Sequence, residues 1–331
     1  MAARRRDRSP DSIIAQRDAP MLSQAKSPEE NIERLPESDQ SSERQPTARE
    51  RAATWIVRAV VALTCLAPVA TPALADAVVA RAWARALRCP LVHHCLFEAA
   101  LATWGFFQAI AFYQFLDSTE AARRWRFDRS APVPYATSSD SRRGGLEAGL
   151  YLGGVALYHA FKAKAPPAAA PPTAARLLGE LAAGIFCYDL LFYGIHRAFH
   201  ARRAPAWLRR LHAEHHRRED GGALRARETT HHSLVDGFLQ VLCNVLVQRR
   251  SLPLFSGAPK HDLSRCLHNV VVTYMLVEIH SGYDAPWCMH NVAPGIFGGA
   301  KAHEHHHKHG TACFHEFLRW IDVLLGSALP P

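Results

Sequence analysis

The sequence lacks several patterns that would point to common kinds of site. Its eight cysteines include no C-x-x-C pair and no even spacing, so we interpret them as small buried hydrophobic residues rather than metal ligands or disulfides. No G-x-G-x-x-G motif follows a strand pattern, which leaves no recognisable nicotinamide site. Glu-x-x-His pairs begin only at Glu228 and Glu304, too few for the carboxylate-rich site of a soluble ferritin-like bundle.

The N-terminal segment lacks apolar runs and is poor in aromatic residues. Residues 1–51 hold ten basic and ten acidic side chains, so the net charge of +9 belongs to the rest of the chain. Such a composition buries too little apolar surface to offset chain entropy, and we predict a disordered tail over residues 1–52. The first apolar run begins after residue 52, which argues against a cleaved signal peptide. The opening RRRDR is interpreted as solvated charge, with a targeting or lipid-headgroup role as the alternative.

Long apolar runs recur along the remainder of the chain. About 20 apolar residues are needed to cross roughly 30 Å of hydrocarbon as a helix. We predict an all-α integral-membrane bundle of four to six spans, with a soluble all-helical enzyme as the alternative. The domains are expected at residues 53–173, the N-terminal spans and a linker, and at residues 174–331, the catalytic region. The candidate spans are Trp55–Val79, which Pro68 and Pro72 interrupt, Leu91–Leu116, Leu146–Phe161, Ala175–Ile195, Leu234–Val247 and Leu263–Ile279.

Basic loops indicate how the spans are oriented. Residues 117–146 carry six arginines against four acids, and residues 197–220 carry seven against three. The positive-inside rule places both loops in the cytoplasm, and the parity of the spans then puts all the histidine clusters on that side, in a helical cap. The exceptions are Arg81, Arg85 and Arg88, which fall on the far side if Trp55–Val79 crosses the membrane.

Histidine is the residue present in excess, with twenty in the chain. Two lie four residues apart, and two triplets follow an i, i+3, i+4 spacing that places side chains on one face of a helix. Zinc takes about four ligands, so these histidines imply two metal ions. Imidazole-rich sites suit iron, zinc or copper. The candidate ligands are His196, His200, His212, His215, His216, His280, His303, His306 and His307.

Two other interpretations use the same residues. HEHHH matches the H-E-x-x-H zinc motif, so a membrane zinc protease would use His303, Glu304 and His307. That interpretation leaves the five histidines between His196 and His216 without a role. A non-catalytic membrane protein that binds metal or lipid is the third possibility.

Several of these motifs carry a resemblance to a known family. HRAFH, LHAEHH, EIHSGYDAPW, HNVAPGIFGGAKAHEHHH and WIDVLLGS resemble the fatty acid hydroxylase/sterol desaturase superfamily of membrane-bound non-haem di-iron enzymes over residues 174–328. The H-S-G-Y-D-x-P-W and G-G-A-x-x-H-x-x-H-H portions are most similar to sterol-acting members such as cholesterol 25-hydroxylase and C4-methylsterol oxidase. The chain departs from the family pattern at Glu304, where Asp is usual, and through the extra His305 and His309.

The resemblance implies roles for the nine histidines and for the chain. It makes them the ligands of two iron ions, with any tenth position open among His231, His232 and water. It implies O2-dependent oxidation of a membrane lipid, with a sterol as the favoured substrate and hydroxylation favoured over desaturation. Electrons would come from an external reductant such as cytochrome b5 or a ferredoxin-like protein. The implied location is the endoplasmic reticulum, with the metal site facing the cytoplasm and no nucleic-acid partner.

Residues outside the ligand set are expected to support it. Metal-bound histidines need an acceptor for their second nitrogen. Asp189, seven residues before His196, is one candidate, and Asp284 and Asp322 are others. The Arg-rich stretch from Arg202 to Arg218 would attract an acidic donor protein, although solvated loop charge explains it equally well. Phe186, Phe192 and Tyr193 are expected either at the mouth of a lipid pocket or in helix packing.

Overall fold

The computed structural model describes residues 45–129, 138–217, 222–249 and 259–329. Regular structure within these ranges is helical, which confirms the all-α prediction. Contacts divide the chain into Met1–Thr47 and Ala48–Pro331. The helices of the second unit are α3 (Ala48–Ala70), α4 (Pro72–Leu87), η1 (Pro90–His93), α5 (Phe97–Asp117), α6 (Glu120–Arg123), α7 (Ser138–Phe161), α8 (Ala174–Phe199), α9 (Ala206–Ala213), η2 (Ala226–Thr230), α10 (Leu234–Arg249), α11 (Asp262–Ile279), α12 (Met289–Val292), α13 (Gly299–His309) and α14 (Trp320–Leu324).

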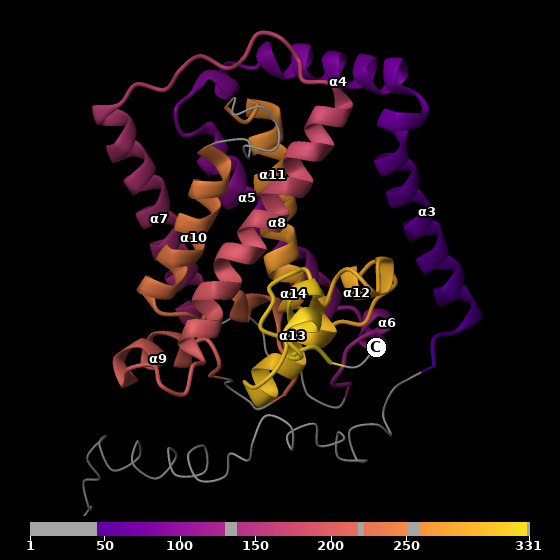
Figure 1. Cartoon of the computed structure of the whole chain (residues 1–331), viewed down its shortest axis with the longest axis vertical. Helices are drawn as coiled ribbons and strands as arrows, with labels where there is room; N and C mark the ends of the chain where they lie inside the picture. The colour runs from indigo at the N-terminus through magenta and orange to yellow at the C-terminus, as the bar shows by residue number, and fades with distance from the viewer. Residues whose placement is uncertain (1–44, 130–137, 218–221, 250–258, 330–331) are drawn as a thin grey trace, which may run out of the picture. The chain divides into compact units, whose positions relative to one another are not determined.

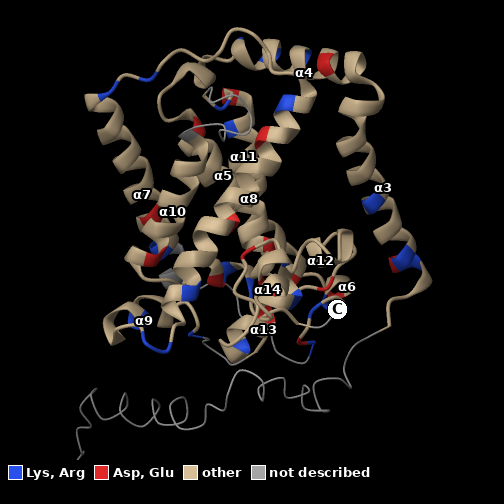
Figure 2. Ribbon diagram, in the orientation of Figure 1, with Lys and Arg blue, Asp and Glu red and all other residues tan. Residues whose placement is uncertain are grey.

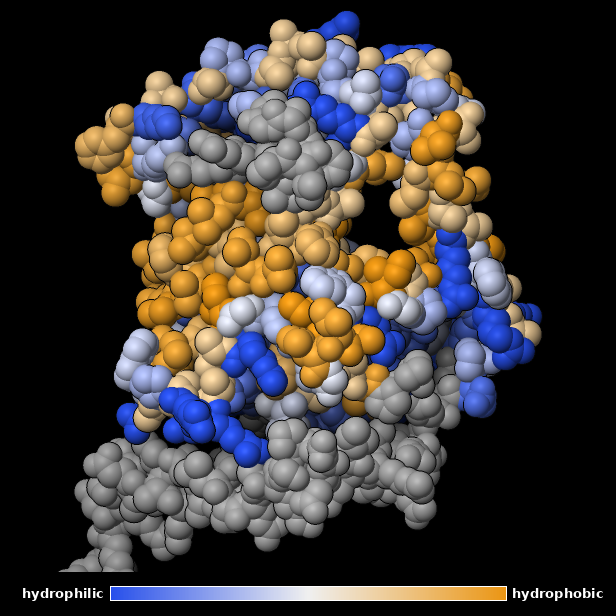
Figure 3. Space-filling model, viewed as in Figure 1, coloured by the Kyte–Doolittle hydropathy of each residue, from blue (hydrophilic) through white to orange (hydrophobic). Residues whose placement is uncertain are grey.

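A bundle of long helices forms the body of this unit. Helices α5, α7, α8, α10 and α11 run lengthwise beside one another (Figure 1), and α11 packs against both α5 and α8. Apolar side chains form a band across the middle of the face shown in Figure 3. Three helices, α3, α5 and α8, are long and apolar enough to cross a membrane, and α10 is a shorter apolar helix. An integral-membrane helical bundle is therefore the architecture, while the count of four to six spans remains a prediction.

The first candidate span is two helices rather than one. Helix α3 ends at Ala70, and Pro72 opens α4 as its first residue. Proline fits a first helical position because its missing N–H has no partner there, and Thr71 before it has left the helical conformation. Pro68 lies inside α3 without ending it. The expected interruption of Trp55–Val79 is therefore confirmed at Pro72 and wrong at Pro68. The part of this candidate span from Pro72 to Val79 belongs to α4, which lies across the end of the bundle in Figure 1.

The core fixes the ends of the helices that carry histidines. One buried cluster joins α8, α10 and α11 through side chains that include Tyr188, Phe192, Val272, Met275 and Ile279. Phe192 therefore packs in the core rather than at a pocket mouth. Tyr193 also packs, against Phe314 and Ile321, and Phe186 stacks on Trp320 at 5.3 Å between ring centroids.

Candidate metal centre

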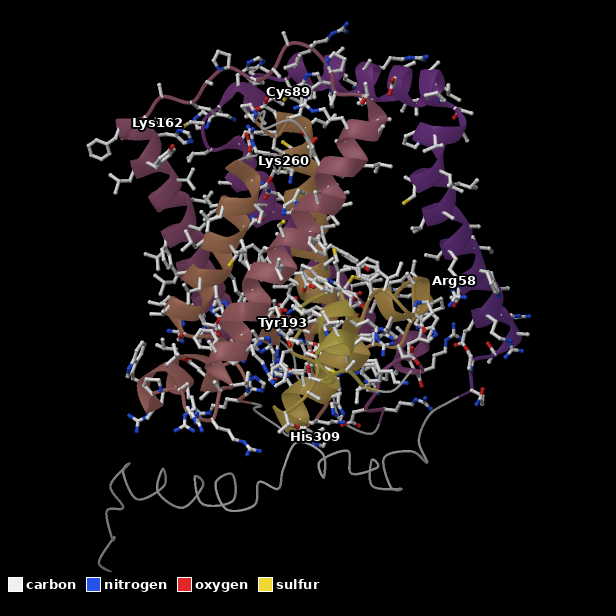
Figure 4. The ribbon with its side chains drawn as sticks, viewed as in Figure 1. Arg58, Cys89, Lys162, Tyr193, Lys260 and His309 are labelled. Carbon is white, nitrogen blue, oxygen red and sulfur yellow. The ribbon has the colours of Figure 1, made fainter. Side chains whose placement is uncertain are left out.

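The nine histidines meet at one end of the bundle in two adjoining groups. Within each group the candidate ligand atoms all lie within 4.8 Å of one another. Helices α8, α9, α13 and the end of α11 bring them there, at the end where Figure 4 labels His309. The first group is His196, His200, His212, His216 and His306, and the second is His215, His280, His303 and His307.

The spacing within each histidine motif determines which of the two groups a histidine joins. Residues four apart share a group, as do His303 and His307, whereas the i+3 residue His306 joins the other group. The middle motif behaves alike, although α9 ends at Ala213 and His215 and His216 lie beyond it. The prediction that residues 212–216 form one helical stretch is therefore only partly correct. His215 and His216 lie in a turn that continues from the end of α9.

Backbone carbonyls determine which nitrogen of several rings carries the proton. The Nδ1–H of His196 donates to the carbonyl of Phe314 at 2.9 Å, and that of His306 donates to the carbonyl of Ala312 at 2.8 Å. His280 donates likewise to Leu276 at 2.8 Å. A carbonyl oxygen only accepts, so the Nε2 atoms of these rings bear lone pairs. These Nε2 lone pairs are available to coordinate a metal ion.

The Nε2 atoms of the second group lie close to one another. Nε2 of His280 lies 3.2 Å from Nε2 of His215, whose Nδ1 donates to the carbonyl of His231. Nε2 of His303 lies 2.9 Å from that of His280 and 3.1 Å from that of His307. Nitrogens bound to one ion at ordinary metal–nitrogen lengths lie about 2.9–3.4 Å apart. The second group therefore has the spacing of a coordination sphere.

The first group shows the same need for a cation. Nε2 of His212 lies 3.1 Å from Nε2 of His216. The Nε2 atoms of His196, His200 and His306 are buried and have no hydrogen-bond partner. A buried acceptor without a partner costs about 1–3 kcal/mol, and a bound metal would remove that cost. The residues present thus fit a metal ion in each group.

Burial keeps these imidazoles neutral. It lowers the pKa of His215, His303 and His307 well below the ordinary value of 6.5, and neighbouring histidines lower it further. Burial also lowers the pKa of His280, to about 4. Neutral imidazole is the form that binds metal, so the site is prepared to accept ions without first releasing protons.

The carboxylates play other roles than those predicted. Asp236, at the start of α10, is fully buried and accepts from Nδ1 of His212 at 2.8 Å. Sequence reasoning missed it, since only contact across 24 residues reveals the pairing. Asp189 contacts no candidate ligand among the described residues. Its oxygens accept the backbone N–H groups of Glu316, Phe317 and Leu318, and so hold the segment that follows Phe314.

The other two predicted acceptors contact histidines outside the two groups. Asp322 accepts from Nδ1 of His315 at 2.6 Å, and Asp284 lies 3.0 Å from Nε2 of His290. Both aspartates are structural partners of neighbouring loops. Their expected role beside ligand histidines is therefore not seen.

The turn that carries His280 is held by residues far away in the sequence. The hydroxyl of Tyr283 donates to Asp117 at 2.8 Å, and Arg126 pairs with the same carboxylate. Gly282 has φ of +71°, and a Cβ there would overlap the carbonyl oxygen of Leu224. Only glycine tolerates both conditions. Asp117 and Arg126 are further positioning residues that the sequence alone did not indicate.

The remaining predicted positions lie outside the two groups. His231 offers its carbonyl to His215, and His232 lies 3.7 Å from Glu147. His305 and His309 contact each other. Glu304 accepts the N–H of Leu224 at 2.8 Å and lies 3.5 Å from Lys308. Among the described residues, none of these five belongs to a metal-binding set.

Comparisons with known proteins agree with this geometry. Residues 181–327 match the family described as fatty acid hydroxylase. Cholesterol 25-hydroxylase of Homo sapiens is 30% identical over 166 residues, covering 49% of this chain and 56% of that protein. A Danio rerio protein, cholesterol 25-hydroxylase-like protein 1, member 2, is 31% identical over 169 residues, covering 49% and 56%. A protein of Dictyostelium discoideum provisionally named as a methylsterol monooxygenase is 29% identical over 172 residues, covering 51% and 58%.

The match is confined to part of each protein. The chain spans somewhat more than half the length of these relatives. No solved structure matches it. The resemblance of the histidine-rich region to the superfamily and to its sterol-acting members is confirmed.

Proposed function

We propose that this chain, whose residues 181–327 match the fatty acid hydroxylase family, is a membrane-bound di-iron oxygenase that hydroxylates a membrane lipid. The observation that carries the proposal is the pair of histidine groups whose candidate ligand nitrogens converge at one end of an apolar helical bundle. The family description and the names of the relatives support lipid oxidation of the hydroxylase type. The identity of the metals, the choice of hydroxylation over desaturation and the substrate are finer parts of the same proposal.

The proposed ligands are the nine histidines, five in one group and four in the other. A pair of irons would supply the reduction of O2 and the removal of hydrogen from an unactivated C–H bond. The chain supplies the surroundings. His196, His215, His303, His306 and His307 are buried, so the site excludes water. Asp236 and the carbonyls of Phe314, Ala312, Leu276 and His231 hold the rings in their binding orientation.

A sterol is the substrate we favour. The relatives are named as cholesterol 25-hydroxylases or, provisionally, as a methylsterol monooxygenase, and the motifs at His280 and in helix α13 are those that resemble sterol-acting members. Long-chain acyl lipids are the alternative substrates. Position decides between hydroxylation and desaturation, since both begin with the same hydrogen abstraction.

We further propose that the protein lies in the membrane of the endoplasmic reticulum and that the metal end of the bundle faces the cytoplasm. The Arg-rich segments around α6 and α9 both lie at this end, as the blue residues in Figure 2 indicate. Exposed Arg202, Arg203, Arg210 and Arg217 give an acidic electron donor such as cytochrome b5 a surface to approach. Arg218 lies outside the described residues.

The test combines metal analysis with lipid profiling. Purified protein should contain about two irons per chain, and cells that express it should accumulate a lipid heavier by one oxygen atom. The double variant His215→Ala, His216→Ala should lose both. The matched control His305→Ala, His309→Ala removes two nearby histidines from outside the groups and should retain both. A lipid lighter by two hydrogens would mean desaturation, and an unchanged lipid profile would refute the oxygenase.

The zinc protease is the weaker hypothesis. Its general base would be Glu304, but this carboxylate is buried and already accepts the N–H of Leu224. Glu304→Gln should therefore retain most of the lipid-oxidising activity, whereas a protease would lose nearly all activity without its base. Oxygen uptake that depends on lipid and reductant would in turn exclude a non-catalytic metal carrier.

A further inference from the structure

Helix α4 carries three arginines at the end of the bundle opposite the metal centre. Arg81, Arg85 and Arg88 follow an i, i+4, i+7 spacing, which places them on one face over about 10 Å. All three are exposed. The opposite face of α4 is fixed, because Trp83 is buried and its indole N–H donates to the carbonyl of Ala168 at 2.8 Å. The arginines therefore project from a helix that cannot turn away.

The three arginines surround a hollow. Its volume is about 580 Å³, and its lining is Arg81, Ala84, Arg85, Arg88 and Cys89. Cys89 lies at the end of the bundle far from His309 in Figure 4. This open hollow brings three guanidinium groups to one surface, and phosphate oxygens accept paired N–H donors from arginine.

No described acidic side chain neutralises this arginine face by a salt bridge. Nearby carboxylates are already engaged: Asp76 accepts the backbone N–H of Ala174, and Glu98 pairs with Arg265 at 2.8 Å. Asp262 pairs with the same arginine. Three like charges within one hollow repel one another, and an anion bound between them relieves that repulsion. An anion from outside the described residues would therefore complete this arginine face.

The position of α4 identifies the source of the anion. The helix follows α3, which is long and apolar enough to cross a membrane, so α4 lies near the opposite membrane surface. Its neighbouring exposed residues Leu74 and Val78 are apolar, as in a helix that rests at the level of lipid headgroups. The positive-inside rule predicts few basic residues on the membrane side opposite the metal centre. Contact with lipid headgroups would explain why these three arginines are there.

We propose that Arg81, Arg85 and Arg88 form a binding site for the phosphate headgroup of an anionic phospholipid. The site is separate from the metal centre and from the oxidised substrate, so it does not depend on the proposed function. A bound headgroup would fix α4, and through it α3, against the membrane surface. Free phosphate shares the chemistry, and the experiment separates the two sources.

The test measures which lipid the detergent-solubilised full chain retains. Native mass spectrometry with added phosphatidylglycerol should show one bound lipid that phosphatidylcholine does not replace. The triple variant Arg81→Gln, Arg85→Gln, Arg88→Gln should weaken binding by about a hundredfold, since each surface arginine contributes roughly fivefold. The matched control Arg202→Gln, Arg203→Gln, Arg210→Gln removes the same charge at the metal end and should bind normally. An equal loss of lipid binding in both variants would show that only net charge matters, and would overturn the proposed binding site.

Cys89 offers a local readout of the same site. Its thiol is exposed, so the prediction of buried cysteines is wrong here, as it is at Cys65. A headgroup in the hollow should slow modification of Cys89 by a maleimide, measured on the Cys89 peptide. Phosphatidylglycerol should protect it several-fold more than phosphatidylcholine at equal concentration. Protection by inorganic phosphate equal to that by the lipid would assign the hollow to a free anion and overturn the lipid site. No protection by either would refute a binding site there.

Discussion

The properties of the metal centre begin with single atoms. Each ring that donates Nδ1–H to a carbonyl or to Asp236 presents an unprotonated Nε2 to its neighbours. Nε2 of His280 is one of these atoms, and it lies 2.9 Å from Nε2 of His303 and 3.2 Å from Nε2 of His215, distances that one bound ion would impose. Acceptors on the outer side of the rings should therefore contribute to the affinity of the proposed metal site.

Asp236 provides the first test at this scale. Asp236→Ala removes the acceptor that orients His212, and metal affinity should fall about 10–100-fold. Competition with a chelator measures the affinity, and the thermal midpoint of the metal-free protein shows whether the variant is folded. The matched variant Asp284→Ala removes an aspartate that contacts His290, outside both groups. Equal affinities for the two variants would contradict the orienting role.

The buried histidines also predict how acid affects the metal-free protein. Their folded-state pKa values are lowered below 6.5 by burial, so the unfolded chain gains protons first as pH falls. Stability is thus fully present above pH 6.5 and is lost as pH falls through the range below it, by roughly 1 kcal/mol per histidine between pH 6.5 and 5.5. Thermal midpoints against pH measure this loss. The slope should become shallower in His215→Ala, His216→Ala and stay unchanged in His305→Ala, His309→Ala.

At the scale of elements, the site depends on connections between helix ends and loops. Asp189 on α8 holds three consecutive N–H groups of the segment before α14. Asp117 at the end of α5 holds Tyr283 in the turn after α11. Each carboxylate fixes a loop that carries or supports a histidine. Helix packing alone would leave these loops free to move the rings apart.

Gly282 tests the turn after α11. Gly282→Ala places a Cβ against the carbonyl of Leu224 in a conformation that alanine adopts poorly, and we expect a loss of about 3 kcal/mol of stability. The metal content should fall because His280 moves. Gly149→Ala on α7 is the control, since its Cβ meets nothing within 4 Å and alanine favours a helix. Thermal midpoints and metal content of the two variants decide the outcome, and equal values would contradict the strained turn.

The sequence predicted the helices better than their connections. Apolar runs located α5, α8 and α11, and histidine spacing identified side chains that do share a group. Local spacing cannot reveal contacts such as His212 with Asp236 or Tyr283 with Asp117, because the partners lie far apart in the chain. It also could not show that the helix breaks at Thr71 rather than at Pro68, since proline is tolerated in more than one helical position.

The whole molecule from Ala48 onward has charged ends and an apolar middle (Figures 2 and 3). The histidines and one basic surface occupy one end, and the α4 arginines occupy the other. Surfaces of the same charge at opposite ends should recruit different partners. This separation allows matched substitutions of equal charge to serve as controls for each other.

Electron delivery should depend on the basic surface at the metal end. Arg202→Gln, Arg203→Gln, Arg210→Gln should slow oxidation of reduced cytochrome b5 by about tenfold at low salt, with the difference disappearing at high salt as charges are screened. Stopped-flow absorbance measures the rate. The triple substitution on α4 should leave it unchanged. If neither triple substitution changes the rate of cytochrome b5 oxidation, the arginines near α9 would be ordinary solvated charges rather than a docking surface.

The alternation of histidines between the two groups affects how the centre is assembled. Helix α13 places His303 and His307 in one group and His306 in the other, and the motif at residues 212–216 divides its histidines likewise. If each group binds an ion as proposed, the first ion would immobilise residues that the second ion requires, so the entropic cost of ordering would be shared. Titration of the metal-free chain should give a sigmoidal curve with few singly occupied molecules. Removal of one proposed ligand from either group should then lower the occupancy of both, so a centre with one ion should be unstable.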